Sequence, residues 1–437
     1  MPRLTRSAAR EQRTAALRGL LVGEDGFSPE FFVLVFEHLD LEDLNRTSSV
    51  CKFLHDSAVA LEAAWEVLDN PPRRITELQQ PLCATALQDG QVVVGLWNTH
   101  ARGRAIDVIS LSNHTRRGAL RYGDEPGDCE IVDAAASDGT HLYVCDRGNR
   151  RIQKLSLPSF EFVASNETPG TAWGICWWAG PTARAGRAST SRGPATSRGA
   201  GRLFVSVKTE AGGSLLVLDA GSMAKVGEFG LGFLSSPQQV TEHGGFLYVA
   251  DTRERTPLLN GCVVVFTVAG AFVRRIELQC GESTGPNVLS RPGRPVRIRP
   301  SGVAVVGGRL VVSGNKWAQP DDDVAPWELI ETLCDPRTHE GEIQVLTLEG
   351  LLRQAILRPY AMHFGPVGVR VGAGGDEMLL VTDRGSFPGA RHFPGAPGAA
   401  GEPRGSLFVF STSPRSREVM RSWDAGREPL PRLAGWE

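Results

Sequence analysis

The chain has 437 residues and a formal net charge of −2, with 22% charged and 41% hydrophobic residues. This length is too great for one small hydrophobic core, so we expect two domains. The near-neutral charge excludes a partner selected by bulk electrostatics, such as nucleic acid or an acidic membrane surface, and partners must be sought in local surfaces.

Residues 1–24 form a basic leader. Its positive charges are Arg3, Arg6, Arg10, Arg13 and Arg18, set among Ser and Ala. An organellar transit peptide has a similar composition, but Glu11 and the helical segment that follows argue against one. We therefore expect residues 1–24 to be disordered.

Residues 25–70 carry the signals of a small helical domain. Ser28 before Pro29 is a helix start, because Ser caps free backbone N–H groups and Pro fits the first helical position. Dense apolar residues follow in 31–39, and Asp40 is placed to cap a second helix. A third helix is predicted from apolar residues three and four positions apart, namely Val50, Phe53, Leu54, Ala58 and Leu61.

The order of these anchors resembles an F-box. The matching residues are Pro29, Phe31, Phe32, Val35, Phe36, Leu39, Asp43, Leu44, Val50, Cys51, Lys52, Phe53, Trp65 and Leu68. Ser28 and Leu54 depart from the family pattern, which has Leu and Trp there. The resemblance implies docking to a Skp-type adaptor through an apolar surface of Pro29, Phe32, Val35, Leu39, Leu41, Leu44 and Val50. The alternative is a three-helix cap packed on the next domain.

After an expected linker at 71–80, short apolar runs repeat to about residue 423. The first run of each copy lies at 92–94, 142–144, 203–205, 247–249, 310–312 and 379–381, and a partner run follows each one. Further runs precede most copies (172–176, 301–305, 367–371) or follow them (272–276, 351–356). Four short strands per copy, bounded by Gly, Asp, Asn and Ser, predict a six-bladed β-propeller over residues 81–423, with a tail at 424–437.

The sequence leaves two ways to close the ring of this propeller. The ring could close with residues 82–85 as the inner strand of the first blade, or with a strand borrowed from 419–423.

The copy at 128–166 closely resembles an NHL repeat, through Leu142-Tyr143-Val144-Cys145-Asp146, Gly148-Asn149, Arg151 and Ile152-Gln153. The strand-end Asp recurs at Asp251 and Asp383 but is Leu96, Val207 and Gly314 in the other copies.

Long insertions gather on one predicted face. Segments 251–261, 317–340 and 384–404 join second to third strands, and 280–295 enters the fifth blade on the same side, which marks a candidate target-binding face. The candidate residues are Trp317, Asp321, Asp322, Asp323, Trp327, Arg253 and Arg384. The acidic insertion suits a basic target; the alternative is a solvated loop whose tryptophans fold back onto the blade. On the opposite face, 179–202 is basic but lacks the interleaved aromatics of RNA-binding segments, so we expect no nucleic-acid partner.

An enzyme is the competing interpretation. Some six-bladed propellers are metal-dependent lactonases, and Asp146, Asp251 and Asp383 could form part of a carboxylate ring for Ca²⁺. The alternative is that each Asp accepts hydrogen bonds from its own turn. The sequence has no His-x-x-x-His pair and no nucleophile elbow. We expect no enzyme and no cofactor.

The eight cysteines never occur at Cys-x-x-Cys spacing, which favours buried thiols in a reducing compartment. With no apolar run long enough to span a membrane, we expect a cytoplasmic or nuclear protein with no membrane partner. The resemblances together imply the substrate-recognition subunit of an SCF-type ubiquitin ligase, which binds a Skp-type adaptor, a cullin and an unidentified target protein. The alternatives are a hydrolase or lactonase-like enzyme with a helical cap, and a plain interaction scaffold.

Overall fold

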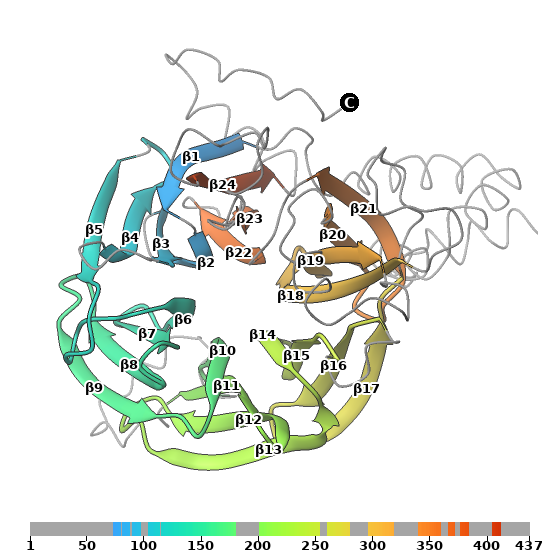
Figure 1. Ribbon diagram of the computed structural model, residues 1–437, viewed down its shortest axis with the longest axis horizontal. Coiled ribbons are helices and arrows are strands. Elements are labelled where there is room, and N and C mark those ends of the chain that lie inside the picture. The colour runs from blue at the N-terminus through green and yellow to red at the C-terminus, as the bar shows by residue number, and fades with distance from the viewer. Residues whose placement is uncertain are drawn as a thin grey trace, which may run out of the picture. The chain divides into compact units, whose positions relative to one another are not determined.

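The computed structural model describes residues 73–79, 81–87, 90–97, 104–113, 115–180, 201–253, 260–279, 296–318, 340–359, 366–371, 376–383 and 404–411. Their strands form six four-stranded antiparallel sheets (Figure 1). The first sheet contains β2 (Pro81–Ala86), β3 (Gln91–Leu96), β4 (Arg104–Ser110) and β5 (Arg116–Arg121). The second contains β6 (Val132–Ser137), β7 (His141–Asp146), β8 (Arg151–Ser156) and β9 (Phe162–Glu167).

The remaining sheets follow in chain order. The third contains β10 (Thr171–Trp178), β11 (Arg202–Thr209), β12 (Gly212–Asp219) and β13 (Lys225–Leu234). The fourth contains β14 (Pro237–His243), β15 (Phe246–Asp251), β16 (Cys262–Thr267) and β17 (Phe272–Glu277). The fifth contains β18 (Val296–Val306), β19 (Arg309–Ala318), β20 (Glu340–Leu346) and β21 (Leu352–Pro359). The sixth contains β22 (Pro366–Val371), β23 (Asp376–Asp383), β24 (Arg404–Ser411) and β1 (Arg73–Gln79).

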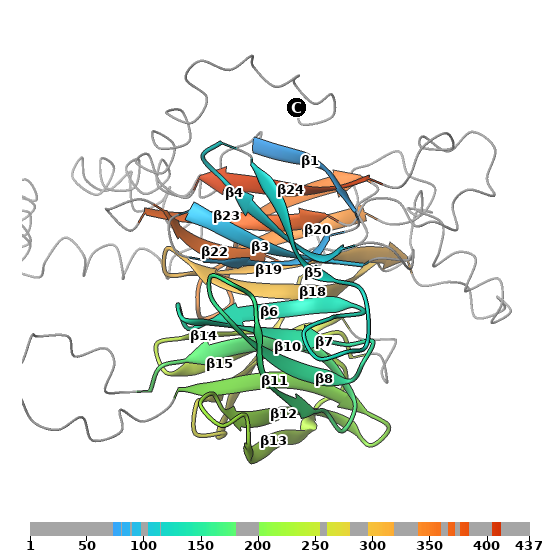
Figure 2. The ribbon, with the colours of Figure 1, turned by 90° about the vertical axis from the view of Figure 1, so that its left-hand side faces the viewer.

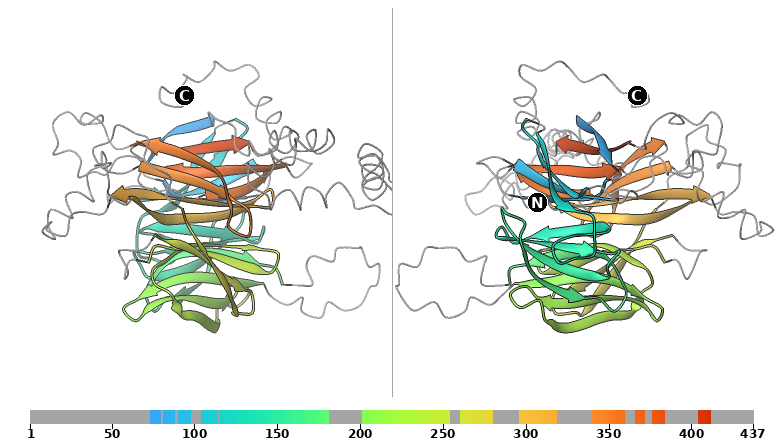
Figure 3. Two further views of the ribbon diagram at one scale, coloured as in Figure 1. Left: turned by 90° about the vertical axis from the view of Figure 1, so that its right-hand side faces the viewer. Right: turned by 60° about the vertical axis from the view of Figure 1, so that its left-hand side comes forward.

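The sheets are arranged around a common axis. The innermost strands β2, β6, β10, β14, β18 and β22 each contact the next one, and β22 contacts β2. In each of the first five sheets the strands pair in chain order outward from the axis. The side views show the strands of each sheet running alongside one another (Figures 2 and 3). The expected mainly β propeller is thus confirmed, and the number of described sheets equals the number of repeat copies in the sequence.

The hydrophobic core is divided between the sheets. Six clusters of buried side chains each join two neighbouring sheets, from the first and second around to the sixth and first. The second and third strands are covered on both faces, which is why runs such as Leu142 to Cys145 and Cys262 to Phe266 are apolar at every position. The outermost strands cover one face only, and β9 alternates exposed and half-buried positions. Each fully buried Val, Leu or Phe side chain contributes about 1.5–3 kcal/mol.

The ring is closed by a strand that the sequence assigned to a linker. Residues 71–80 were expected to be a linker, but β1 pairs with β24 as the outermost strand of the sixth sheet. A register shift between Ile75 and Leu78 breaks the alternation of its only two apolar side chains, so the pattern of a strand is not visible. Leu78 is 1% exposed in the cluster between the sixth and first sheets. Of the two closures that the sequence left open, the inner strand near 82–85 is present as β2.

The described residues contain no α-helix. The F-box-like segment 25–70, the basic leader and the tail at 424–437 lie outside the described residues, as does the alternative closing strand at 419–423. Within the part of the chain that the structure describes, no helix is long and apolar enough to cross a membrane.

Candidate binding site at one mouth of the propeller

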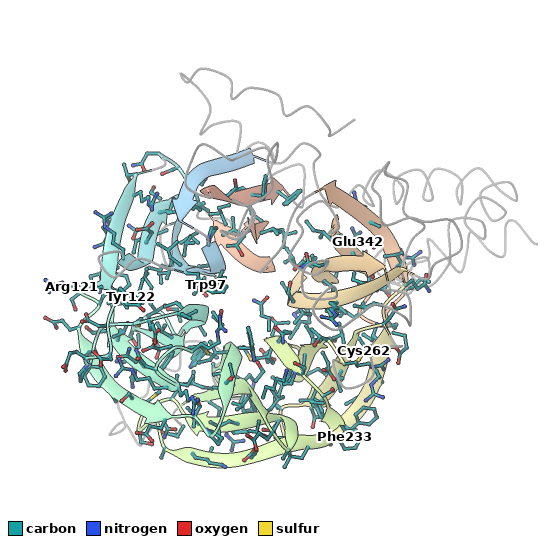
Figure 4. The ribbon with its side chains drawn as sticks, in the orientation of Figure 1. Trp97, Arg121, Tyr122, Phe233, Cys262 and Glu342 are labelled. Carbon is teal, nitrogen blue, oxygen red and sulfur yellow. The ribbon has the colours of Figure 1, made fainter. Side chains whose placement is uncertain are left out.

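Four side chains from three consecutive sheets meet where the second strands of the blades end. Trp97 directly follows β3, and Arg147 directly follows β7. Asp133 and Trp173 lie near the beginnings of the inner strands β6 and β10. Because neighbouring strands are antiparallel, second-strand ends and first-strand beginnings share one face of the ring. We call these four residues the tryptophan cage. Figure 4 shows Trp97 beside the inner strands of the first two sheets.

Arg147 occupies the middle of the cage. Its Cζ atom lies 5.6 Å from the ring centroid of Trp97 and 4.5 Å from that of Trp173. Its Nε forms an ion pair with Oδ2 of Asp133, whose side chain is 7% exposed. The Arg147 side chain is 21% exposed, so the site has an opening to solvent. A guanidinium held on aromatic faces within about 6 Å gains about 0.5–2 kcal/mol, more where water is excluded.

Local backbone geometry fixes the position of Arg147. The backbone N–H of Arg147 donates to the carbonyl of Ile131 at 2.8 Å, and Ile131 also forms a β-bridge with Trp97. Arg150 closes the turn with φ of 51°, a left-handed conformation that costs a non-glycine residue energy. A Cβ on Gly148 would lie 2.5 Å from the Cβ of Glu130, which has to shift to admit any other residue in this turn.

Trp173 lies in an irregularity of its strand. The register of β10 against β11 shifts between Ala172 and Gly174, which leaves Trp173 without a partner in the pairing. A bulge of this kind redirects one side chain, here the indole that stacks on Arg147. The Nε1 atom of Trp173 is buried and has no hydrogen-bond acceptor among the described residues. The cage therefore contains a buried indole N–H with no acceptor in the described part of the chain.

The NHL-like residues lie directly beside the cage but serve another purpose. Asp146 is fully buried and accepts hydrogen bonds from Asn149 Nδ2 at 2.8 Å, Arg151 Nε at 2.9 Å and Gln153 Nε2 at 3.1 Å. Its Oδ1 accepts from the backbone N–H of Glu130 at 2.9 Å. The carboxylate therefore joins the link that enters the second sheet to the turn and third strand of that sheet.

Arg151 and Gln153 extend this anchoring network. Arg151 Nη2 donates to the carbonyls of Glu125 at 2.8 Å and Asp128 at 2.9 Å. Gln153 Nε2 donates to the same Asp128 carbonyl at 2.6 Å, and its Oε1 accepts from the N–H of Gly127 at 3.0 Å. The repeat signature thus fastens residues 125–130 to the second sheet.

The fourth and fifth sheets use variants of this arrangement. Asp251 accepts from the backbone N–H groups of Ser235 at 3.0 Å and Ser236 at 2.7 Å, which belong to the link entering the fourth sheet. In the fifth sheet Gly314 stands opposite Glu342, and Gln344 Nε2 donates to Glu342 Oε1 at 2.6 Å. Gln344 also donates to the carbonyl of Gln279 in the preceding link. The sequence signal for this role is the Ile-Gln pair shared by the third strands β8 and β20.

These contacts bear on the carboxylate ring that the enzyme alternative needs. Asp146 accepts one hydrogen bond from the incoming link, from Glu130 N–H, and one from its own turn, from Asn149 Nδ2. Asp251 accepts two from its incoming link, and Arg253 N–H, at 3.3 Å from its Oδ1, is an own-turn donor. Asp383 ends β23 opposite Ser406. No group of three or more metal-ligating side chains occurs among the described residues.

A second polar cluster lies on the opposite face, at the hairpin of β6 and β7. Burial opposes ionisation of Asp138, but hydrogen bonds from Thr140, Tyr143 and His141 lower the pKa of its carboxyl group to about 2. Lys154 Nζ donates to the carbonyls of Ala220 at 2.8 Å and Gly221 at 3.1 Å in the third sheet. This cluster joins the second and third sheets.

The thiols that the structure describes are buried, as the sequence predicted. They are Cys83, Cys129, Cys145, Cys176 and Cys262. Burial raises the pKa of Cys83 and of Cys262 to about 12. Because the thiolate is the reactive form, these side chains act as small apolar groups.

The candidate target-binding residues divide into three groups. Arg253 is 8% exposed, and its Nη1 donates to Glu277 Oε2 at 2.8 Å and to the carbonyl of Asn260 at 3.2 Å, so it fixes the start of its insertion. The backbone of Trp317 belongs to β19, opposite Arg297. The others, Asp321, Asp322, Asp323, Trp327 and Arg384, lie outside the described residues, as do the adaptor-binding candidates Pro29, Phe32, Val35, Leu39, Leu41, Leu44 and Val50.

Sequence reasoning missed the tryptophan cage. Its members are separated along the chain and become neighbours only through the order of the sheets. The visible signals were a Trp immediately after a strand run, at Trp97, and a Trp inside a predicted inner strand, at Trp173. Aromatic residues at such places pack against neighbouring blades often enough that neither signal alone indicates a site.

Comparisons with known proteins give structural likeness alone. No family model matches the chain, and no curated protein matches it. Among solved structures, it is similar to Kuenenia stuttgartiensis hydrazine synthase with 14% identity and a TM-score of 0.43, covering 72% of this chain and 79% of that one. It is also similar to the Myceliophteria thermophila Cps50 (Swd1) β-propeller domain, with 9% identity, a TM-score of 0.40, and coverage of 78% and 100%. The Dos1 propeller matches with 10% identity, a TM-score of 0.36, and coverage of 73% and 70%. With every one of these TM-scores below 0.5, no functional property is transferred from these proteins.

Proposed function

We propose that the chain is the substrate-recognition subunit of an SCF-type ubiquitin ligase, in which an F-box-like segment at 25–70 docks a Skp-type adaptor and a six-bladed propeller binds the target protein. The observation that carries the proposal is the order of apolar anchors from Pro29 to Leu68, followed by a mainly β propeller. Such a subunit works by proximity, since it holds the target and the ligase in one assembly. In this role the protein is cytoplasmic or nuclear.

The use of the buried carboxylates favours binding over catalysis. The hydrolase alternative needs Asp146 and Asp251 as ligands of a metal ion, but both side chains accept hydrogen bonds from the links that enter their own sheets. A metal ion would have to displace those donors. A recognition subunit needs only a rigid platform, and inter-blade anchoring supplies one.

Co-purification tests this proposal. The full-length chain should retain a Skp-type adaptor and a cullin, whereas a Leu41→Asp/Leu44→Asp double variant should lose both, because charges in an apolar interface are not desolvated without cost. An Arg10→Asp variant in the basic leader is the matched control and should bind like the natural sequence. Absence of both partners from the natural chain would refute the ligase role and leave the scaffold and enzyme alternatives.

A further inference from the structure

The tryptophan cage has the composition of a cation-recognition site. Two indoles from the first and third sheets flank a guanidinium from the second, and a nearly buried carboxylate neutralises the charge. Aromatic faces beside an acidic group attract a cation, whether it belongs to a ligand or to the protein itself. The resident cation sits on a turn and retains 21% exposure of its side chain.

We propose that the tryptophan cage binds an arginine side chain of the target protein, and that Arg147 occupies this site in the free protein and leaves it when the target binds. The inference rests on the proposed role of the propeller in target recognition. The incoming guanidinium would repeat the contacts that Arg147 makes with Trp97, Trp173 and Asp133. The displaced Arg147 would be hydrated at the mouth of the ring.

The exchange has a physical basis in the charge of Asp133. Its carboxylate is 7% exposed, and a charge so placed requires a partner. The Asp133 carboxylate is neutralised by Arg147 before the exchange and by the target arginine after it.

The test measures peptide binding by tryptophan fluorescence. The probe is acetyl-Gly-Arg-Gly-amide, and the matched ligand is the same peptide with citrulline, which is neutral and nearly isosteric. Purified Arg147→Ala protein should bind the arginine peptide at least ~10-fold more tightly than the natural protein does, and at least ~10-fold more tightly than it binds the citrulline peptide, which corresponds to about 1.4 kcal/mol.

Two further variants separate the cage from a general gain in affinity. Arg147→Ala combined with Trp173→Ala should lose the preference for arginine. Arg202→Ala is the matched control, because Arg202 lies over a single indole, that of Trp178, at 6.0 Å, and its removal should add no binding. Equal binding of both peptides by Arg147→Ala, or the same gain from Arg202→Ala, would overturn the proposal.

An Arg147→Lys variant covers the case in which Arg147→Ala does not fold. Lysine keeps a charge beside Asp133 but lacks the planar group that stacks on the indoles, so the arginine peptide should displace it more readily than it displaces Arg147. Affinities equal to those of the natural protein in this variant would also refute the exchange. Since neither adaptor nor cullin is present, failure here would leave the ligase role standing, and loss of adaptor binding would leave the cage untouched.

Discussion

The second and third sheets hold their incoming links in different ways. The second sheet uses a buried carboxylate, and the third uses a backbone hydrogen bond. At the end of its second strand the second sheet has Asp146, which gathers side-chain and backbone donors around the incoming link. The third sheet has Val207 there, fully buried in the cluster between the two sheets. Its incoming link is tied by a backbone bond from Thr168 N–H to the Arg150 carbonyl at 2.8 Å. The blade geometry therefore does not require a strand-end carboxylate, which instead fixes the links entering the second and fourth sheets.

Removing the carboxylate of the second sheet should have the largest effect. Asp146→Ala leaves the Arg151 guanidinium, whose side chain is 14% exposed, without its carboxylate and removes an acceptor from Asn149 and Gln153. We therefore expect a loss of about 3–5 kcal/mol in the free energy of unfolding. Urea denaturation gives this value. Asp146→Asn keeps one acceptor oxygen and should lose less. A loss below about 1 kcal/mol for Asp146→Ala would mean that the network is not what holds the link.

The fourth sheet should be less sensitive. Asp251→Ala removes an acceptor from neutral backbone donors, chiefly those of Ser235 and Ser236, and leaves no unpaired cation. We expect a loss of about 2–3 kcal/mol by urea denaturation. Thr252→Ala, which removes a long bond of 3.3 Å to the Ser236 carbonyl, is the control and should cost under about 1 kcal/mol. A larger loss for Asp251→Ala than for Asp146→Ala would reverse the ranking of the two sheets.

In the third sheet, a polar side chain in place of Val207 should destabilise the fold. Val207→Thr places a hydroxyl in an apolar cluster at nearly unchanged volume, and we expect a loss of about 1–2 kcal/mol in thermal or urea unfolding. Val226→Thr on β13 makes the same change at a side chain that is 56% exposed, and it should be neutral. Equal tolerance at both positions would show that the Val207 site already accepts polar groups.

Acid should destabilise the second sheet through Asp138, at the end of the sheet opposite Asp146. The pKa of Asp138 is about 2 in the folded protein, below the value near 3.9 of a free aspartate, so its ionised form stabilises the fold above about pH 4. That contribution is lost as the pH falls from about 4 to about 2. Melting temperatures measured across this range should fall less steeply for Asp138→Asn than for the natural protein. Parallel curves would assign the acid sensitivity to other groups.

Particular residues show how far sequence reasoning reaches. The strand runs and their order were visible because both faces of the central strands are covered, which leaves apolar side chains at each position. β1 was missed because an outermost strand buries one face only and its bulge shifts Leu78 out of alternation. Asp146 was noticed, but its main backbone donor, Glu130, precedes it by sixteen residues and belongs to a link without a strand pattern. The tryptophan cage could not be predicted, because it depends on the bulge at Trp173 and on the bridge between Trp97 and Ile131, neither of which has a visible sequence pattern.

Pairing of β1 with β24 also determines when the ring can close during synthesis. Gln79 and Arg404 are partners in the sixth sheet, so β1 cannot pair until β24 has been synthesised. At a translation rate of about 5–20 residues per second, the intervening segment takes tens of seconds to appear. Throughout that interval the edge of β1 has no β24 to pair with, and Leu78 lacks the β23 and β24 side chains of its cluster. The nascent chain thus has a period of exposure that only its final propeller strand ends, and a chaperone acting on this protein would be needed most at that stage.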